Sequence, residues 1–435
     1  MTVQKTRPEA SKQRGKEKGW LRRWRWIVFS VAVVILAVAL AAYFFRPYWF
    51  PSAWTFARHL QGAGQSSREA QPVDSGDAAG SKGQEGQSEE AKDGAQGAEK
   101  SQETSGQATE NVYAAPASGK IKDSLADVPE RVYVPNVGDG TISVIDPSTF
   151  KVVDSYSVGK LPYHITPSWD MSKLYVDNEE SSTFTIIDPG SGRPDGSVSA
   201  TYPYNFYYTP DGSKAIVVAE RLQRMEFRDP KTWDLLGSVY IPSPGVDHLD
   251  FSADGSYLLA SSEWGGVVSK IDVNAMQIVG YANVGGLPID VKLSPDGSVF
   301  YVANQGRMGV SAVDPKTMKE IDFIPTGRGA HGLQVSRDTK SLYVTNRLEG
   351  TISVIDFATR KVTDTWTTGG TPDMMQLSPD GKQLWVSGRY DGVVYVLDTV
   401  TGKLLSTIHT GKEPHGLTYF PNSGRFSLGH NGVYR

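Results

Sequence analysis

From about residue 128 onward, short apolar runs rich in Val, Ile, Thr and Tyr recur along the chain, and polar clusters with Gly, Asn, Asp and Pro separate them. The clearest example has one run at 341–346, a turn at 346–350 and a second run at 351–356. These residue types favour the pleated surface of a β-sheet, so the stretch predicts strand, turn and strand. Because a two-stranded unit is not stable alone in water, we expect it to stack against copies of itself.

Two series of turn residues fix the number of copies. The Asp that ends the second run of each unit recurs every 41 to 43 residues, at Asp146, Asp188, Asp229, Asp272, Asp314, Asp356 and Asp398. A second series, in turns such as Ser294–Gly297, keeps the same phase at Asp170, Asp211, Asp254, Asp296, Asp338, Asp380 and Asn422. A period near 40 with four short strands per unit is typical of β-propellers. The sequence therefore predicts an all-β, seven-bladed β-propeller.

The motif residues also resemble a known repeat. Tyr343–Asn346, followed by Gly350–Asp356, resembles the YVTN-type bacterial β-propeller repeat family, and weaker copies stand at 131–136, 174–178 and 301–304. The third and fourth units depart from the Asn pattern, at 217–221 and 258–264. The resemblance covers about residues 128–435 and implies the propeller fold. It indicates little about function, because propellers carry many different activities.

The order of the strands predicts how the ring closes. The repeats begin with a second strand at Arg131, and the chain ends with an inner strand at 414–420 and a further strand near 425–430. We therefore expect strands from both ends of the domain to complete one blade, which leaves no exposed sheet edge around the ring.

The N-terminal region has a different character. Residues 26–45 form an uncharged apolar run that spans about 30 Å as a helix, which matches one hydrocarbon core. Residues 1–25 hold nine Lys or Arg against two Glu, so the positive-inside rule places them in the cytoplasm. We expect a single-pass anchor in the cytoplasmic membrane, with the propeller in the periplasm or at the cell surface. A cleaved signal peptide is the alternative, because 39–41 match a cleavage site, and both interpretations export the domain.

Residues 46–110 are predicted to form a juxtamembrane segment and an acidic linker. The part at 61–110 has no aromatic residue and carries four basic and ten acidic residues. Such a segment cannot bury enough apolar surface to order itself, so we expect a disordered tether with a reach of about 40 Å. The propeller domain is assigned to 111–435, and residues 111–127 fit either an edge strand or a plug on the ring.

The composition and the motifs of the chain limit the kinds of functional site that it can contain. The chain has no Cys, which excludes disulfides, thiolate nucleophiles, Cys-based metal sites and the Cys motif for covalent haem attachment. The formal net charge is −4, so the whole chain has no strong bias toward anionic partners. The sequence lacks the nucleophile elbow, the zinc-protease motif and the phosphate-binding loop. This disfavours common hydrolases and nucleotide enzymes.

Polar residues recur just before the inner strands, six and seven positions ahead of the second Asp series. Because inner strands line the channel of a propeller, ring closure should gather these residues around one mouth of the channel. His and Asp in a pocket can bind a metal, hold an anion or transfer protons, and the alternative is an ordinary wet channel mouth. The predicted ligand-binding residues are His164, Asp247, His248, Asp290, His331, Asp373 and His415.

The loops after the Tyr-Val strands should share this face. Their basic and aromatic residues suit an anionic ligand or partner, although acidic residues in equivalent loops offset much of the charge. The residues predicted for this anion or partner face are Arg221, Trp264, Arg307, Arg347, Arg389 and Tyr390. His409 and His430 lie near the end of the chain, and we expect both to be structural.

Three functional hypotheses follow. The leading one is a non-catalytic binding or scaffold module for an envelope ligand, polymer or protein. The second is an enzyme, either a lactonase-like hydrolase or a redox protein, with a metal or haem-type cofactor at the channel mouth; it rests on analogy with other propellers. The third is binding of single-stranded nucleic acid by the Arg and aromatic face, which predicts an affinity that falls steeply with salt.

Overall fold

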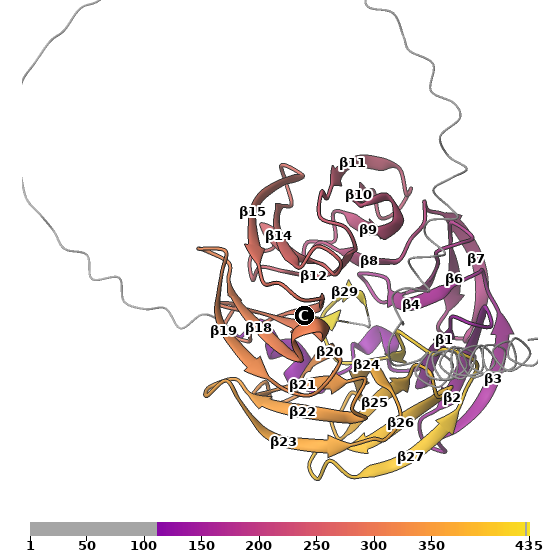
Figure 1. Ribbon diagram of the computed structural model, residues 1–435. Coiled ribbons are helices and arrows are strands. Elements are labelled where there is room, and N and C mark those ends of the chain that lie inside the picture. The colour runs from indigo at the N-terminus through magenta and orange to yellow at the C-terminus, as the bar shows by residue number, and fades with distance from the viewer. Residues whose placement is uncertain (1–110, 431–432) are drawn as a thin grey trace, which may run out of the picture. The chain divides into compact units, whose positions relative to one another are not determined.

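The computed structural model describes residues 111–430 and 433–435, which belong to one compact unit, Glu103–Arg435. The predicted anchor at 26–45 and the linker at 46–110 lie outside the described residues. Within the described part, no helix has both the length and the apolar character needed to cross a membrane. The strands form seven sheets around a common axis, which confirms the seven-bladed propeller (Figure 1).

Each blade runs from an inner strand at the axis to an outer strand at the rim. The closing blade contains β28 (Thr418–Phe420), β1 (Arg131–Asn136), β2 (Thr141–Asp146) and β3 (Lys151–Ser157). The next three blades contain β4 (Pro162–Pro167), β5 (Leu174–Asn178), β6 (Thr183–Asp188) and β7 (Arg193–Ser199); β8 (Asn205–Tyr208), β9 (Ala215–Ala219), β10 (Arg224–Arg228) and β11 (Leu235–Tyr240); and β12 (Val246–Phe251), β13 (Tyr257–Ser262), β14 (Val267–Asp272) and β15 (Gln277–Asn283).

The remaining three blades follow the same order. They contain β16 (Pro288–Leu293), β17 (Phe300–Asn304), β18 (Gly309–Asp314) and β19 (Lys319–Pro325); β20 (Ala330–Val335), β21 (Ser341–Asn346), β22 (Thr351–Asp356) and β23 (Lys361–Thr367); and β24 (Pro372–Leu377), β25 (Gln383–Gly388), β26 (Val393–Asp398) and β27 (Leu404–His409). Two 3₁₀ turns, η2 (Glu220–Leu222) and η3 (Gln305–Arg307), follow β9 and β17. The inner strands β12, β16 and β24 are buried at every position, whereas the outer strand β3 is largely exposed.

The ring closes as the sequence predicts. The late strand β28 pairs antiparallel with the early strand β1, with Arg131 opposite Phe420 and Tyr133 opposite Thr418. The fully buried Trp385 of the preceding blade packs against Tyr419 of β28, with 5.9 Å between ring centroids. Apolar packing between blades therefore holds the two ends of the domain together.

The Asn of the repeat motif has a structural task that explains its recurrence. In the best copy, Asn346 Nδ2 donates to Thr351 Oγ1 at 3.0 Å and to Ser353 Oγ at 2.9 Å. Its Oδ1 accepts from the backbone N–H of Gly327 at 3.0 Å. Gly327 lies in the loop that leads into the inner strand of the same blade. Asn136 makes the same three contacts in the closing blade, to Thr141, Ser143 and Gly411. The motif residue thus ties the turn of a blade to the loop before the inner strand.

The C-terminal segment leaves the ring and enters its centre. β29 (Ser427–Gly429) pairs with β8 and with β30 (Val433–Tyr434), so this blade has six strands, and β29 lies inside the ring (Figure 1). We call β29 and β30, together with the adjoining described residues His430 and Arg435, the C-terminal hairpin. Arg435 Nη2 donates to both carboxylate oxygens of Asp250 on β12, at 2.9 and 3.0 Å. The predicted late strand is therefore present, but it fills the axis.

Residues 111–127 form helical turns and no edge strand. They contain α4 (Ala114–Ala117) and η1 (Asp123–Leu125), and the buried Tyr113 donates its hydroxyl to the carbonyl of Leu293 at the end of β16. The Arg435 guanidinium lies over the Tyr113 ring, 4.2 Å from its centroid. A cavity of about 30 Å³ lies beside these groups. This segment therefore caps the end of the channel at which the inner strands finish.

Candidate functional site

The opposite end of the ring, where the inner strands begin, is called the mouth here. At the mouth, five inner strands shift register against their neighbours, and each shift encloses the two positions that lie six and seven residues before the second Asp series. Such bulges often re-aim side chains near functional sites. The shifts lie between Pro162 and Ile165, Val246 and Leu249, Pro288 and Val291, Ala330 and Leu333, and Pro372 and Met375.

A repeated hydrogen bond supports the bulges. The N–H of the second bulge residue donates to a side chain 13 positions later, on the next strand of the blade: His248 to Ser261, Gly332 to Thr345 and Met374 to Ser387. The hydroxyl can then donate onward to the next blade, as Thr345 does to the carbonyl of Asp373 at 2.6 Å. The hydroxyls of Ser261 and Thr345 therefore link a bulge to the adjacent blade, whereas Ser387 Oγ donates to the carbonyl of Met374 in its own bulge at 3.3 Å.

The first complete blade replaces this hydroxyl with a carboxylate, and His164 takes over its task. Asp177 Oδ1 accepts from the N–H of His164 at 2.6 Å, and burial raises the pKa of this carboxyl group well above its usual value. The ring of His164 makes the link to the next blade, from Nδ1 to the carbonyl oxygen of Tyr204 at 2.9 Å. A carbonyl only accepts, so Nδ1 carries the proton and Nε2 has the free lone pair. That Nε2 is buried and has no hydrogen-bond partner.

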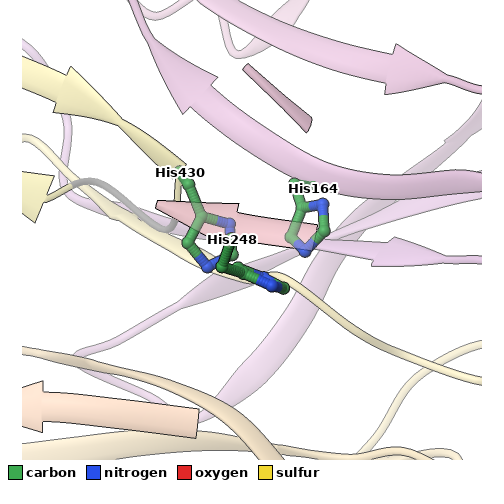
Figure 2. Close-up of side chains that lie close together, drawn as sticks. All are labelled: His164, His248 and His430. Atoms are coloured by element: carbon green, nitrogen blue, oxygen red, sulfur yellow. The ribbon is translucent and has the colours of Figure 1, made fainter. Parts of the chain in front are cut away.

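His164 belongs to a group of three buried imidazoles that we call the axial histidine cluster: His164 on β4, His248 on β12 and His430 on the C-terminal hairpin (Figure 2). One ring nitrogen from each residue lies within 4.8 Å of the other two. The His430 centroid is 4.5 Å from that of His164 and 4.1 Å from that of His248. Each of the three residues has 0% exposure to solvent.

The surroundings of His164 and His430 favour the neutral imidazole. Burial lowers the pKa of His164 and of His430 well below the usual range, and the neighbouring histidines lower both further. His248 Nδ1 lies 2.6 Å from Asp247 Oδ1 in a close contact that lacks hydrogen-bond geometry. Neutral imidazole presents a lone pair, which is the form in which it binds metals.

The sequence argument missed His430. This residue was expected to be structural because it lies after the last repeat, in a chain end without a polar tail. The structure places it at the ring axis, between two predicted site residues on other blades. Its position cannot follow from the repeat phase, because the C-terminal hairpin is an addition outside the repeating unit.

A second group, the mouth ion-pair cluster, surrounds the fully buried Asp373. It consists of His331, Arg347, Asp373, Arg389 and His415. Asp373 Oδ1 accepts from Arg347 Nε at 2.9 Å and lies 3.0 Å from His331 Nδ1. Its Oδ2 lies 2.6 Å from His415 Nδ1 and 4.0 Å from Arg389 Nη1.

The electrostatics of this cluster favour a charged carboxylate and neutral imidazoles. Burial alone would raise the pKa of Asp373, but Arg347, His331 and Arg389 together bring it below the usual value. Burial lowers the pKa of His331 and of His415, and the adjacent guanidinium groups lower it further. Two guanidinium groups thus share one carboxylate, which leaves a local excess of positive charge.

Arg389 carries that excess. Its Nε and Nη1 are buried and have no hydrogen-bond partner, although 12% of the side chain is exposed. The guanidinium lies 5.6 Å from the ring centroid of Tyr163, whose ring is 5.8 Å from that of His415. The His415 ring in turn lies 4.8 Å from that of His164, so the two clusters are adjacent.

The other side of the mouth is acidic. Arg221 makes a paired contact with Glu179, through Nε and Nη2, each at 3.0 Å. Trp264 Nε1 donates to Glu220 at 3.4 Å. Burial, with a contribution from Asp247, raises the pKa of Glu263 to about 8. Protonation therefore relieves the crowding of carboxyl groups on this side at neutral pH.

Some of the predicted site residues form structural contacts or lie at the outer rim of the mouth. Asp290 pairs with Lys292 at 3.0 Å and accepts from the N–H of Leu333 on the next inner strand at 2.8 Å. Arg307 pairs with Glu320 at 2.6 Å and lies over Phe323. Tyr390 is 39% exposed at the rim. The structure thus gathers His164 with His248, and His331 with Asp373 and His415, whereas Asp290 links neighbouring blades.

Comparisons with known proteins agree with this architecture. The family model described as "YNCE-like beta-propeller" matches residues 118–425. No curated protein matches the chain. Among solved structures, a functionally unknown protein from Desulfotomaculum acetoxidans DSM 771 aligns with a TM-score of 0.59 and 17% identity, over 66% of this chain and 98% of that one.

Two further structures share the fold. Hydrazine synthase from Kuenenia stuttgartiensis aligns with a TM-score of 0.52 and 20% identity, over 58% of this chain and 87% of that chain. Dihydro-heme d1 dehydrogenase NirN, in complex with DHE, aligns with a TM-score of 0.53 and 17% identity, over 67% of this chain and 75% of that chain. At these identities the likeness concerns the fold alone.

Proposed function

This chain belongs to the YNCE-like β-propeller family, and we propose that it is a ligand-binding module that receives an anionic group at the mouth of its axial channel. The observation that carries the proposal is Arg389, a largely buried guanidinium whose Nε and Nη1 have no hydrogen-bond partner. Buried donors without a partner are costly, so this site favours an acceptor that arrives from outside.

The neighbours of Arg389 favour an anion over a neutral acceptor. Asp373 is already engaged by Arg347 and His415, so its charge is shared. A carboxylate or phosphate at Arg389 would complete a charge-assisted, paired hydrogen bond, which is the strongest arrangement available to a guanidinium. Tyr163 offers an aromatic surface beside it. The carboxyl groups of Glu220 and Glu263 would form hydrogen bonds with a hydroxyl-rich part of the same ligand.

The proposal includes a location. Residues 1–25 are basic and 26–45 are uncharged and apolar, which supports a membrane anchor with its N-terminus in the cytoplasm. The propeller would then act outside the cytoplasm, in the periplasm or at the cell surface, on an envelope polymer, small ligand or protein. The long acidic linker would let the mouth reach its ligand away from the membrane.

The pairing of rim cations favours a confined anionic group over a single nucleic-acid strand. Binding along a strand needs a row of free cations and exposed stacking rings. Arg221 is held by Glu179, Arg307 by Glu320 and Arg347 by Asp373. Of the predicted aromatic residues on this face, Tyr390 is exposed, whereas Trp264 is half-buried against Glu220.

The test is calorimetric titration of the full-length chain with inorganic phosphate, acetate and short anionic envelope polymers. We expect at least one of these anions to bind, with a loss of affinity in Arg389→Gln. Absence of binding by every anion tested, or unchanged binding by the variant, would reject the mouth as an anion site.

A further inference from the structure

Three buried imidazoles meet at the centre of the ring without hydrogen-bond partners for most of their nitrogens. The partnerless atoms are Nε2 of His164 and both ring nitrogens of His248 and of His430. Buried polar atoms of this kind are rare, because each one forfeits its hydrogen bonds with water. Their number in one place indicates that the cluster is built to hold something.

We propose that the axial histidine cluster binds one divalent transition-metal ion of the zinc class, and that the C-terminal hairpin supplies the third ligand. The ligand set decides the class of ion. Imidazole nitrogen suits Zn²⁺ and its neighbours, whereas Ca²⁺ and Mg²⁺ prefer oxygen. Three histidines satisfy three positions of a tetrahedral ion and leave the fourth for water or another small ligand.

The spacing fits after a small movement of the rings. The candidate nitrogens lie within 4.8 Å of one another. Bonds of about 2.0–2.1 Å in a tetrahedral site place nitrogens about 3.4 Å apart. Rotation of the three rings about their side-chain bonds supplies this contraction without a change in the strands. His164 and His248 stand on rigid inner strands, so His430 on the hairpin is the ligand with freedom to adjust.

Oxygen atoms lie close to Nδ1 of His164 and of His248, as they commonly do beside metal-binding histidines. The proton on Nδ1 of His164 is held by the carbonyl of Tyr204 at 2.9 Å, with Asp177 Oδ2 at 3.4 Å. Asp247 Oδ1 stands 2.6 Å from Nδ1 of His248. A carbonyl or carboxylate behind the ring fixes its tautomer and raises its basicity toward a metal. His164 therefore offers Nε2 as its ligand atom, whereas the contact of Asp247 with His248 does not select one of the two His248 nitrogens.

The bound ion would also fasten the hairpin. Its described attachments within the channel include the pairing of Gly429 with Tyr207 and the bond of Arg435 to Asp250. A metal shared by His430, His164 and His248 would join the hairpin to β4 and add a second attachment to β12, which already holds Asp250. Because the hairpin fills the axis, we propose a bare ion here and not the haem-type cofactor that the sequence suggested (Figure 1).

The experiment measures metal uptake by the full-length chain produced without a polyhistidine tag. The chain is stripped with EDTA, exchanged into metal-free buffer, given excess Zn²⁺ and desalted, and zinc is counted by mass spectrometry. We expect about one ion per wild-type chain, and none in His164→Ala or His430→Ala. His409→Ala is the matched control, because His409 lies exposed at the end of an outer strand, and it should keep the ion.

A second measurement covers variants that fail to fold, which circular dichroism would reveal. Co²⁺ added to the stripped wild-type chain should give the intense visible bands of a four-coordinate site, and Zn²⁺ should abolish them. A folded wild-type chain that takes up neither ion would overturn the proposal. Retention of zinc by folded His430→Ala would overturn the role of the hairpin and place the ion elsewhere.

Discussion

Asp373 Oδ2 and His415 Nδ1 lie 2.6 Å apart although 42 residues separate them in the sequence. The separation equals the repeat length, because both residues occupy the same place in neighbouring blades. A related contact occurs where Asp290 accepts from the N–H of Leu333 and Asp250 accepts from that of Leu293, each 43 residues away and so one residue beyond the equivalent position. Residues about one repeat apart therefore contact each other across the boundary between two blades. Corresponding positions of successive blades form the site.

Removal of the Asp373 charge should destabilise the ring. In Asp373→Asn, the buried Arg347 loses its counter-ion and the nearby Arg389 loses its neighbouring negative charge. Breaking a buried ion pair from one side typically costs about 3–5 kcal/mol. We expect a fall of that size in the free energy of unfolding, measured by urea denaturation at neutral pH.

The control for this variant is Asp195→Asn. Asp195 pairs with Lys173 at 2.7 Å, but its side chain is 57% exposed, and surface pairs contribute about 0–1 kcal/mol. A similar small loss in Asp373→Asn would show that the mouth ion-pair cluster is solvated and that its charges are not held in a dry site.

Arg389→Gln should weaken anion binding with little effect on the fold. A hydrogen bond to a charged group contributes about 1.5–3 kcal/mol, so we expect about a tenfold to hundredfold rise in the dissociation constant. Arg307→Gln is the control, because Arg307 is engaged by Glu320 on an outer strand. Calorimetric titration of both variants with the best-binding anion measures the difference. Equal weakening by both would point to general electrostatic attraction.

Glu263 should make the protein less stable as the pH rises. Its pKa in the folded protein is about 8, against a usual value of 4.5, because burial and Asp247 disfavour the charged form. Between these two values the unfolded chain releases the proton and the folded chain keeps it. The unfolded state then binds fewer protons, so the free energy of unfolding falls with rising pH across this window.

Melting temperatures from pH 5 to pH 9 measure this effect. Glu263→Gln keeps the shape of the side chain without the charge, so we expect a flatter curve and a higher melting temperature at alkaline pH. Glu180→Gln, at an exposed position in an equivalent loop, should reproduce the wild-type curve. Identical curves for the wild type and Glu263→Gln would show that the carboxyl group is ionised without penalty in the folded state.

Asp177→Ser should lower the affinity of the proposed metal site for its ion, because it disturbs the hydrogen bond that orients the His164 ring. Serine restores the hydroxyl found at this place in other blades, which would donate to the carbonyl of Tyr204 and compete with His164 Nδ1 for it. Loss of an outer-shell partner typically reduces metal affinity by about 10- to 100-fold. Competition for Zn²⁺ against a chromogenic chelator measures the change. Ser387→Ala, at the equivalent place in a distant blade, serves as the control, and an equal loss there would contradict the assignment.

The sequence predicted the mouth positions because local structure repeats. Equivalent residues stand at the mouth in successive blades, and five inner strands form the same bulge there, so counting back from the turn Asp found His164, His331, Asp373 and His415. The repeat phase could not predict which charged side chains form ion pairs. Whether Arg347 or Arg389 has an ion-pair partner depends on which acidic side chain lies beside it in the folded ring, and Asp373 lies beside both. The same holds for Arg221, which Glu179 of the neighbouring blade engages.

The sequence alone determined the propeller, its seven blades, its closure by β1 and β28 and the ring of polar residues at the mouth. These follow from short-range preferences repeated at a fixed period. The tertiary structure decided what the period does not encode. It brought His430 from the C-terminal hairpin to His164 and His248, and it made Asp177 a support for His164. It also set the charges, because burial and neighbouring groups, which arise only on folding, determine which groups stay ionised.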